Sequence, residues 1–259
     1  MSSALIGATG FVGTTLLRQR DFDACFHSRN VEQLGELEFD LVVCAGAPAQ
    51  KWLANRDPAA DRARLEPLFA ALRRLRSDYF VLISTVDVFA RPVAVDEESA
   101  PDAAGSLAYG VHRLELERLV MERFPRALIV RLAGLVGPGL RKNAIFDLHH
   151  GNNVAAVDSR GTFQFYPVVR LWPDIALALE AGLRVVHLTA APLTVADVAR
   201  EAFGREFCNE LDAPPAVYDV RSRHARLFGG EGAYQYSRRE SLLAVRAFVQ
   251  SEPVRPARS

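Results

Sequence analysis

A glycine-rich turn at residues 7–13 constrains the fold of this chain more than any other feature. Its sequence is Gly-Ala-Thr-Gly-Phe-Val-Gly, and it follows the apolar run 4–6 and leads into a helix-forming segment at 14–18. Glycines permit a tight turn with positive φ and let a pyrophosphate approach the backbone. The start of the following helix offers unpaired N–H groups to that charge. This order predicts a nucleotide-binding α/β domain; the alternative is a small-residue turn at the edge of any α/β sheet.

Apolar runs alternate with helix-length amphipathic stretches, which is typical of a parallel sheet covered on both faces. We expect strands at 4–6, 23–27, 40–47, 79–84, 127–132, 163–166 and 185–188, and helices at 58–76, 107–124, 173–183, 195–203 and 237–250. The stretch 147–153 is rich in turn residues. The predicted class is α/β: a Rossmann-type doubly wound parallel sheet over 1–140, a smaller C-terminal lobe interleaved with the sheet over 141–252, and a disordered tail over 253–259.

Composition excludes several classes of protein. The 31 basic and 31 acidic residues give a net charge of zero, which argues against a broad nucleic-acid-binding face. No run approaches the roughly 18 apolar residues that span a bilayer, and the N-terminus lacks the basic region of a signal peptide. Cys25, Cys44 and Cys208 form no C-x-x-C motif, and two of them lie in apolar runs, which predicts buried free thiols in a reducing compartment. We therefore expect a cytoplasmic protein without membrane or nucleic-acid partners.

Residues suited to carbonyl chemistry follow the middle strands. The strand 79–84 continues into Thr85, and Tyr109 opens a helix about twenty-five residues later. A spacing of four places Tyr109 and Arg113 on one helix face. Transfer of a hydride to a carbonyl needs a proton donor, and a tyrosine serves if a neighbouring cation lowers its pKa from about 10. The alternative role of Tyr109 is to pack against the sheet.

These segments together resemble the short-chain dehydrogenase/reductase superfamily, in particular its extended, NAD-dependent epimerase/dehydratase-like branch. The spacing Gly7-x-x-Gly10-x-x-Gly13 matches the cofactor loop of that branch, Ala45-Gly46-Ala47 resembles its small-residue strand end, and Tyr109 matches its catalytic tyrosine. Residues 84–89 resemble its active-site strand, which makes Thr85 the catalytic hydroxyl, and 131–139 resemble its nicotinamide-contacting segment. The resemblance assigns to the cofactor Gly7, Thr9, Gly10, Phe11, Val12, Gly13, Ala45, Gly46, Ala47, Ser84, Leu132 and Ala133. It also implies a homodimer.

One residue departs from the family pattern. The family has a lysine four residues after its tyrosine, and this chain has Arg113. Arginine keeps the positive charge, so it can favour the phenolate and bind ribose hydroxyls, but it is planar and always protonated. A proton relay through a lysine ammonium would be lost. Either Arg113 substitutes for the lysine, with Thr85 and Tyr109 as the other catalytic residues, or the site is impaired or has another use.

The end of the second strand predicts the form of the nicotinamide cofactor. NAD enzymes usually place an acidic residue there to bind the ribose 2′-hydroxyl. Here the sequence is His27-Ser28-Arg29-Asn30 and holds no carboxylate. Ser28, Arg29 and Asn30 are suited to a 2′-phosphate, so NADP is preferred over NAD; the alternative is a solvated basic turn.

Substrate-binding residues are less well defined by sequence. Asp87 follows the active-site strand, and the resemblance places Asn143 near the substrate. Gln164 and Tyr166, with Arg141 and Lys142, are further candidates for the same cleft, and each has the alternative of a plain surface residue. Lys51 and Trp52 follow the strand that abuts the cofactor and are candidates to shape the pocket mouth; the alternative is that the tryptophan packs a helix onto the sheet. His149 and His150 have no third ligand at suitable spacing, so no metal is expected.

Two functions remain after these observations. The first is an NAD(P)-dependent oxidoreductase or epimerase acting on a carbonyl or alcohol of a small molecule, which the resemblance makes most plausibly a nucleotide-linked sugar. The second is a nucleotide-binding regulatory or scaffold protein with an impaired active site. Arg113 is the residue that keeps the second function open.

Overall fold

The computed structural model describes residues 2–254, and their contacts divide the chain into two compact units. Unit 1 comprises 2–91, 98–131 and 171–186, and unit 2 comprises 92–97, 132–170 and 187–254. The units therefore alternate along the chain, whereas the predicted division had one boundary, after residue 140, with the C-terminal lobe interleaved with the sheet. Most of the predicted disordered tail, 255–259, lies outside the described residues.

A six-stranded sheet in the order β10-β6-β4-β3-β1-β2 organises unit 1. β1 pairs in parallel with both β2 and β3, and β3 pairs in parallel with β4. The chain passes from β1 to β2 on one side and then to β3 on the other, which creates a topological switch point at the carboxyl ends of β1 and β3. Ligands of α/β sheets bind at such points. The strands are β1 (Ser3–Ile6), β2 (Ala24–Phe26), β3 (Glu38–Cys44), β4 (Arg76–Thr85), β6 (Ala127–Leu132) and β10 (Val185–Leu188).

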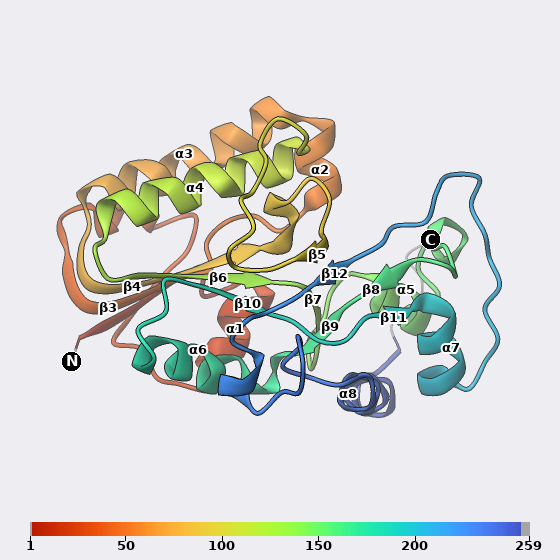
Figure 1. Ribbon diagram of the computed structural model, residues 1–259. Helices are drawn as coiled ribbons and strands as arrows, with labels where there is room; N and C mark the ends of the chain where they lie inside the picture. Colours follow the sequence, from red (N-terminus) through yellow and green to blue (C-terminus); the bar gives the residue numbers. More distant parts are fainter. Residues whose placement is uncertain (1, 255–259) are drawn as a thin grey trace. The chain divides into compact units, whose positions relative to one another are not determined.

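Helices cover both faces of this sheet. α3 (Pro58–Arg74) and α4 (Ala108–Arg123) pack together on one face, and α1 (Phe11–Leu17) and α6 (Leu171–Glu180) lie on the other (Figure 1). α3 begins with Pro58 after Asp57, whose side chain accepts the Ala60 N–H at 3.0 Å and so satisfies one of the unpaired donors at the helix start. Its leucines and those of α4 meet the buried strands in one apolar core. The doubly wound α/β fold is confirmed.

Unit 2 is built from small sheets and helices. β8 (Thr162–Phe163) pairs with β11 (Leu193–Thr194), β5 (Val93–Val95) with β12 (Asp219–Val220), and β7 (Gly134–Val136) with β9 (Phe165–Pro167). α7 (Val195–Phe203) packs against α8 (Arg238–Ser251), which begins with a capping box between Ser237 and Glu240. The helices of this unit are α5 (Ala144–His150), α7 and α8, with the short 3-10 turns η3 (Val154–Ala156), η4 (Val168–Arg170) and η5 (Ala225–Phe228).

Several local expectations need correction. The predicted strand 163–166 is interrupted at Gln164, and α5 extends to His150, into the stretch 147–153 that was expected to be turns. Cys44 is buried, and burial raises the pKa of its thiol to about 12, but Cys25 is exposed because β2 is the edge strand of the sheet. α2 (Lys51–Arg56) was not expected at all, and its Trp52 is 63% exposed, so this side chain does not pack onto the sheet.

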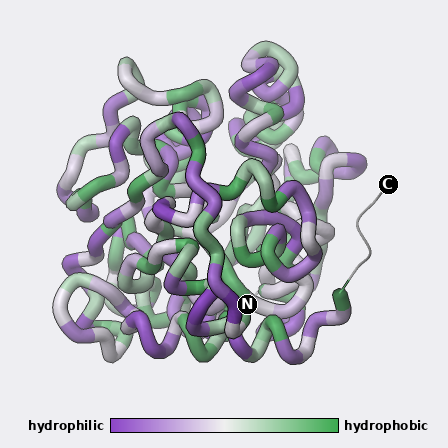
Figure 2. Tube along the Cα trace, turned by 90° about the vertical axis from the view of Figure 1, so that its right-hand side faces the viewer, coloured by the Kyte–Doolittle hydropathy of each residue, from purple (hydrophilic) through white to green (hydrophobic). Residues whose placement is uncertain are grey.

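Hydropathy varies over short distances along the chain. Figure 2 shows green apolar stretches that are repeatedly interrupted by white and purple ones. Within residues 2–254 no helix has the length and apolar character needed to cross a membrane.

The glycine turn brings backbone segments into close contact. Gly7 has φ +88°, and a Cβ there would lie 2.3 Å from the Ala45 carbonyl oxygen at the end of β3. A Cβ on Gly13 would lie 2.1 Å from the Gly7 carbonyl oxygen, and neither backbone oxygen can move away alone. Gly10 differs, because its nearest neighbour would be 3.4 Å away. The fold itself therefore requires glycine at 7 and 13 but leaves room at 10.

We predict that Gly13→Ala destabilises the protein and Gly10→Ala does so much less. The overlap at position 13 forces the turn to shift, which costs about 1–3 kcal/mol in the free energy of unfolding. Gly10 is the N-cap of α1 with φ −75°, which alanine can adopt, so its loss is expected below about 1 kcal/mol. Urea denaturation of the two variants measures the difference. Equal losses would show that the close contact at Gly13 is not what limits the turn.

Candidate active site

The carboxyl edge of the sheet in unit 1 gathers most of the residues predicted to bind a dinucleotide. Thr9 and Gly10 are exposed at the turn, and Ala45, Gly46 and Ala47 follow β3 with partly exposed positions. The Gly7 N–H and the Ala8 N–H donate to the Phe26 carbonyl at 2.7 and 3.2 Å, which joins the turn to the end of β2. The turn is therefore rigidly held, while its tip is open to a ligand at the switch point.

A compact turn follows β2 where a ribose would be recognised. The Asn30 side-chain oxygen accepts the His27 N–H at 2.7 Å, and the His27 ring nitrogen Nδ1 accepts the Arg29 N–H at 3.2 Å. Ser28 and Arg29 are exposed on this turn. Asn30 thus shapes the turn, while Ser28 and Arg29 present a hydroxyl and a positive charge without a carboxylate among residues 27–30.

Thr85 ends β4 and is linked to Asp87 and Lys51. The Thr85 hydroxyl oxygen accepts the Asp87 N–H at 3.1 Å and lies 3.4 Å from Asp87 Oδ2. Lys51 Nζ donates to Asp87 Oδ1 at 2.7 Å. The neighbouring Ser84 is buried, and its hydroxyl donates to Glu117 Oε1 at 2.5 Å. Of the two hydroxyls at this strand end, only that of Thr85 is partly exposed.

Tyr109 lies at the beginning of α4 and is positioned by its backbone. Its N–H donates to the side-chain oxygen of Asn55 in α2 at 3.0 Å. The next residue, Gly110, packs so closely against Asp87 that a Cβ would lie 2.0 Å from the Asp87 carbonyl oxygen. The tyrosine side chain is 9% exposed. The start of α4 is therefore fixed against both α2 and the end of β4.

Arg113 stacks beneath the Tyr109 ring and is held by a buried carboxylate. Its guanidinium carbon lies 4.0 Å from the ring centroid, as the spacing of four predicted. Nη1 donates to Asp61 Oδ2 at 2.5 Å, and Nη2 donates to Asp61 Oδ1 at 3.3 Å and to the Pro48 carbonyl. Arg113 and Asp61 are each 3% exposed. This arginine therefore acts on the tyrosine through its charge and its ring contact, with both terminal nitrogens already bound inside the protein.

The ionisation of Tyr109 differs from the expectation. The sequence predicted that a neighbouring cation lowers the pKa of this phenol, but the pKa is raised overall. Burial has the largest effect and raises the pKa; the charges of Arg113 and Lys51 lower it, and those of Asp87 and Asp61 raise it. Each cation is accompanied by a carboxylate, so the charges around the phenol act in opposite directions. Tyr109 is consequently a neutral phenol at neutral pH and is able to donate a proton.

Predicted site residues in unit 2 make structural contacts. The Gln164 amide nitrogen donates to Thr189 Oγ1, the Ala190 carbonyl and the Val220 carbonyl, and its oxygen accepts the Val220 N–H. Asn143 caps α5, with its oxygen accepting the Phe146 N–H at 3.2 Å. The predicted residues Tyr166, Leu132 and Ala133 are buried. The structure explains Gln164 and Asn143 without a ligand, and their contact with a substrate stays a prediction.

Three residues near Tyr109 were not assigned roles from the sequence. Asn55 and Asp61 have no local motif, and their partners are 51–54 residues away in the sequence. Lys51 was considered only for the pocket mouth, together with Trp52, and not for contact with Asp87. Asp61 is also close to His112, whose Nδ1 lies 2.8 Å from Asp61 Oδ2. A buried aspartate in an otherwise amphipathic helix is the one signal that could have indicated such a partner.

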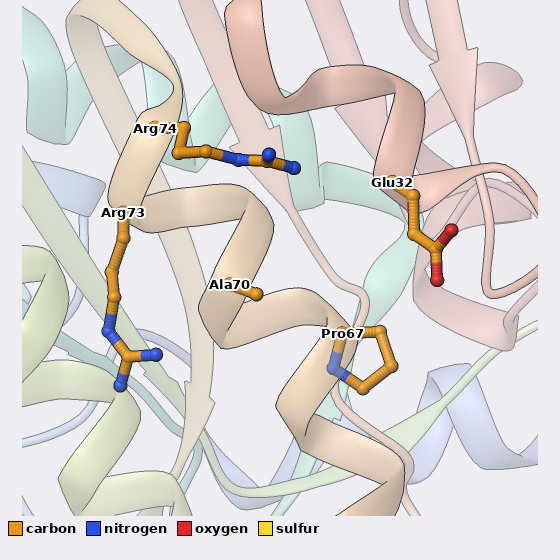
Figure 3. Close-up of a pocket in the computed structure, with 5 residues that line it drawn as sticks. All are labelled: Glu32, Pro67, Ala70, Arg73 and Arg74. Atoms are coloured by element: carbon orange, nitrogen blue, oxygen red, sulfur yellow. The ribbon is translucent and has the colours of Figure 1, made fainter.

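Two cavities are lined by residues other than Tyr109 and those of the glycine turn. Figure 3 shows a cavity of about 510 Å³ in unit 1, lined by residues of η1 (Val31–Glu36) and α3. Its lining residues are Glu32, Pro67, Ala70, Arg73 and Arg74. A second cavity, of about 340 Å³ in unit 2, lies between α5 and the segment 211–216. Neither cavity is lined by a predicted site residue.

We predict that Arg113→Leu destabilises the protein by about 3–5 kcal/mol, because it leaves Asp61 buried without its main partner. Arg62→Leu is the matched control, since its ion pairs with Glu66 and Glu115 are partly exposed and worth at most about 1 kcal/mol. Adding Asp61→Asn to Arg113→Leu should restore part of the loss. Equal losses for Arg113→Leu and Arg62→Leu in urea denaturation would contradict this prediction.

The cost of Arg113→Leu should also depend on pH. Burial raises the pKa of Asp61, but hydrogen bonds and charges from Arg113 and His112 lower it by more, so the folded-state pKa is below its ordinary value. Such a carboxylate contributes stability that is fully present above its unfolded pKa, about 3.9, and is lost as the pH falls through the folded value. The difference in unfolding free energy should therefore shrink below about pH 4. A constant difference down to pH 2 would contradict the linkage.

Solved structures share this fold over nearly the whole chain. dTDP-4-dehydrorhamnose reductase from Bacillus anthracis in complex with NADP is 19% identical with a TM-score of 0.73, covering 97% of this chain and 99% of that one. RMD from Pseudomonas aeruginosa complexed with NADPH is 20% identical (TM-score 0.70; 98% and 100% covered), and MoeE5 in complex with UDP-glucose and NAD is 17% identical (0.67; 96% and 99%). No protein-family model and no curated protein matches the sequence. The comparisons establish the Rossmann-like fold over almost the full length.

Proposed function

We propose that this protein is an NADP-preferring oxidoreductase of the extended short-chain dehydrogenase/reductase type that reduces a carbonyl group of a nucleotide-linked sugar. The observation that carries the proposal is the arrangement in unit 1. There the partly exposed Thr85 hydroxyl interacts with Asp87, and Gly110, the residue after the buried neutral phenol of Tyr109, packs against the Asp87 carbonyl, at the edge of the sheet that carries the glycine turn and the switch point.

The residues present fit a bound nicotinamide dinucleotide. The open tip at Thr9 and Gly10 is suited to the pyrophosphate, and the exposed Ser28 and Arg29 are suited to a 2′-phosphate. When bound, the nicotinamide supplies the hydride. The positive charge of Arg29 has no carboxylate beside it within residues 27–30, which favours NADP over NAD.

The chain's own groups provide the proton chemistry. The Tyr109 hydroxyl would give its proton to the carbonyl oxygen as that oxygen becomes an alcohol. Thr85 would hold the same oxygen by its hydroxyl. Because burial keeps the phenol protonated, the site is better suited to donate a proton, as in reduction, than to remove one, as in oxidation. Arg113 limits how far the pKa of Tyr109 rises.

The similar structures support the choice of cofactor and substrate class. Two of them are complexes with NADPH or NADP, one contains NAD, and two are named for or bound to a nucleotide-linked sugar. At 17–20% identity these names indicate the class to test first and do not choose a particular sugar.

A second function is favoured by one observation. Both terminal nitrogens of Arg113 are bound to Asp61 and Pro48, so this side chain is not available to ribose hydroxyls. This arrangement is consistent with a nucleotide-dependent regulator, that is, a protein that binds the cofactor but reduces a substrate only slowly. The two functions differ in one measurable property, the rate of NADPH oxidation with a suitable sugar.

We predict that Tyr109→Phe lowers the rate of NADPH oxidation at least about 100-fold and leaves NADPH affinity within about twofold. The reason is that loss of a general acid typically costs 10²–10⁴ in rate. The assay follows NADPH absorbance with a panel of nucleotide-linked sugars that includes dTDP-4-dehydrorhamnose, and fluorescence titration gives the affinity. Tyr79→Phe is the control, because Tyr79 lies near the amino end of β4, whereas Thr85 is at its carboxyl end. Wild-type activity in Tyr109→Phe would refute the catalytic assignment, and NADPH binding without turnover of any sugar would favour the regulator.

We further predict that Arg29→Ala weakens NADPH binding about 10-fold to 100-fold and changes NADH binding less than about twofold. A hydrogen bond to a charged group contributes about 1.5–3 kcal/mol, and only NADPH carries the 2′-phosphate. Arg76→Ala is the control, because Arg76 is exposed at the opposite, amino end of β4. Calorimetric titration with both cofactors measures the four affinities. Parallel losses for NADPH and NADH would remove the argument for NADP preference.

A further inference from the structure

Two ion pairs with different access to solvent flank Tyr109. The pair of Arg113 with Asp61 is buried, at 3% side-chain exposure for each partner. The pair of Lys51 with Asp87 is open, with the lysine side chain 41% and the aspartate side chain 19% exposed. Both cations act on the ionisation of Tyr109, and so do both carboxylates. Only one of the two cations is therefore in contact with the solvent that supplies protons.

Lys51 belongs to the same contact network as Tyr109. It is the first residue of α2, and Asn55, one turn later, accepts the Tyr109 N–H. Its partner Asp87 interacts with the Thr85 hydroxyl and has Gly110 packed against its carbonyl. We call these five residues the Lys51 cluster: Lys51, Asn55, Thr85, Asp87 and Tyr109. The cluster lies entirely in unit 1.

Arg113 is chemically unsuited to exchange protons. A guanidinium remains protonated throughout the range in which proteins are folded, whereas an ammonium can release a proton. Arg113 also donates to Asp61 and Pro48, and breaking these bonds would leave the Asp61 carboxylate buried with a weaker set of partners. The position that resembles the family's lysine thus supplies charge and helix placement without a transferable proton.

The composition of the chain makes Lys51 notable. Only two of the 31 lysine and arginine residues are lysines, Lys51 and Lys142. An exposed ion pair on a helix is satisfied by either residue type, and arginine is the cation in the exposed helical pairs Arg62–Glu66 and Arg200–Asp197. A lysine beside Asp87 is accounted for if the site needs an ammonium there.

We propose that Lys51, held by Asp87, is the residue that returns a proton to Tyr109 after each reduction; this rests on the proposed function. The carbonyl carbon gains the hydride, the carbonyl oxygen takes the Tyr109 hydroxyl proton, and a phenolate remains. The Lys51 ammonium then gives a proton to the phenolate, and the resulting amine recovers one from water. The sum is one hydride and one solvent proton added across the carbonyl.

The first test measures the ionisation of Tyr109 without substrate or cofactor. Incorporation of 3-fluorotyrosine lowers the pKa of the phenols, and ¹⁹F NMR resolves the six tyrosines, with Tyr109 assigned by Tyr109→Phe. Lys51→Met should raise the apparent pKa of Tyr109 by about one unit, because Asp87 then acts without its partner. Lys51→Arg should leave it near the wild-type value. Arg56→Met, which removes a positive charge from the last turn of the same helix, should not move it.

A Lys51→Met variant whose Tyr109 titrates as in the wild type overturns the proposal. Asp87→Asn gives an independent arm, since removing the carboxylate should lower the pKa of Tyr109. Groups that act on Tyr109 from the other elements are Arg113 on α4 and Asp61 on α3, and both are unchanged in these variants. This titration decides the coupling of Lys51 to Tyr109 even if no sugar is reduced, so its outcome is separate from that of the proposed function.

The second test separates charge from proton return. With an active substrate, Lys51→Met and Lys51→Arg should both lower kcat about 10-fold or more, with KM for NADPH within about twofold. The Lys51→Arg loss should persist at every pH, because its guanidinium has no proton to give. Full kcat in Lys51→Arg, with a loss of kcat in Lys51→Met alone, would show that only the positive charge is needed and would overturn the proton-return role.

Discussion

The carboxylate of Asp61 is the group on which the geometry around Tyr109 depends. It lies in α3, is buried, and accepts Arg113 while lying beside His112, both in α4. Arg113 continues the connection to the Pro48 carbonyl, just after β3. A buried charge is costly unless it is fully paired, so these contacts restrict how α4 can rotate on α3. Because Tyr109 is one turn before Arg113, the same contacts determine where the phenol points.

Two cation–carboxylate pairs act on Tyr109 in different ways. The buried pair of Arg113 with Asp61 fixes α4 on α3 and contributes a constant positive charge at Arg113. The open pair of Lys51 with Asp87 contributes an ammonium whose protons can exchange with water. Each positive charge is accompanied by a negative one that acts on Tyr109 in the opposite direction, and burial, which has the largest effect, raises the pKa of the phenol. An arginine four residues after the tyrosine is compatible with such a site as long as an ammonium is supplied from elsewhere, and α2 is the element that brings one.

Much of the fold followed from local patterns, and the missed parts depended on distant contacts. The buried strands and long helices were predicted because apolar periodicity extends over many residues, and the spacing of Tyr109 and Arg113 is a property of one helix. α2 has only six residues, and its place depends on Asn55 reaching Tyr109 across 54 positions. Cys25 was expected to be buried, but its exposure depends on β2 being an edge strand, which only the strand order reveals. An aspartate within the amphipathic helix α3 hints at a partner, but nothing local to Asp61 identifies that partner as Arg113 or His112.

The three glycines of the turn show how structure refines the meaning of a motif. Gly7 and Gly13 are required by contacts with Ala45 and with the turn itself, so their presence indicates a tight crossing of backbone and says nothing direct about a ligand. A Cβ on Gly10 would make an ordinary contact, 3.4 Å from the Gly7 carbonyl oxygen, and Gly10 makes no side-chain cap for α1, a position that serine or aspartate fills better. The protein's own packing gives no reason for glycine there. Close approach of a phosphate to the backbone does give one, and Gly10 is therefore the member of the motif that argues most directly for a bound nucleotide.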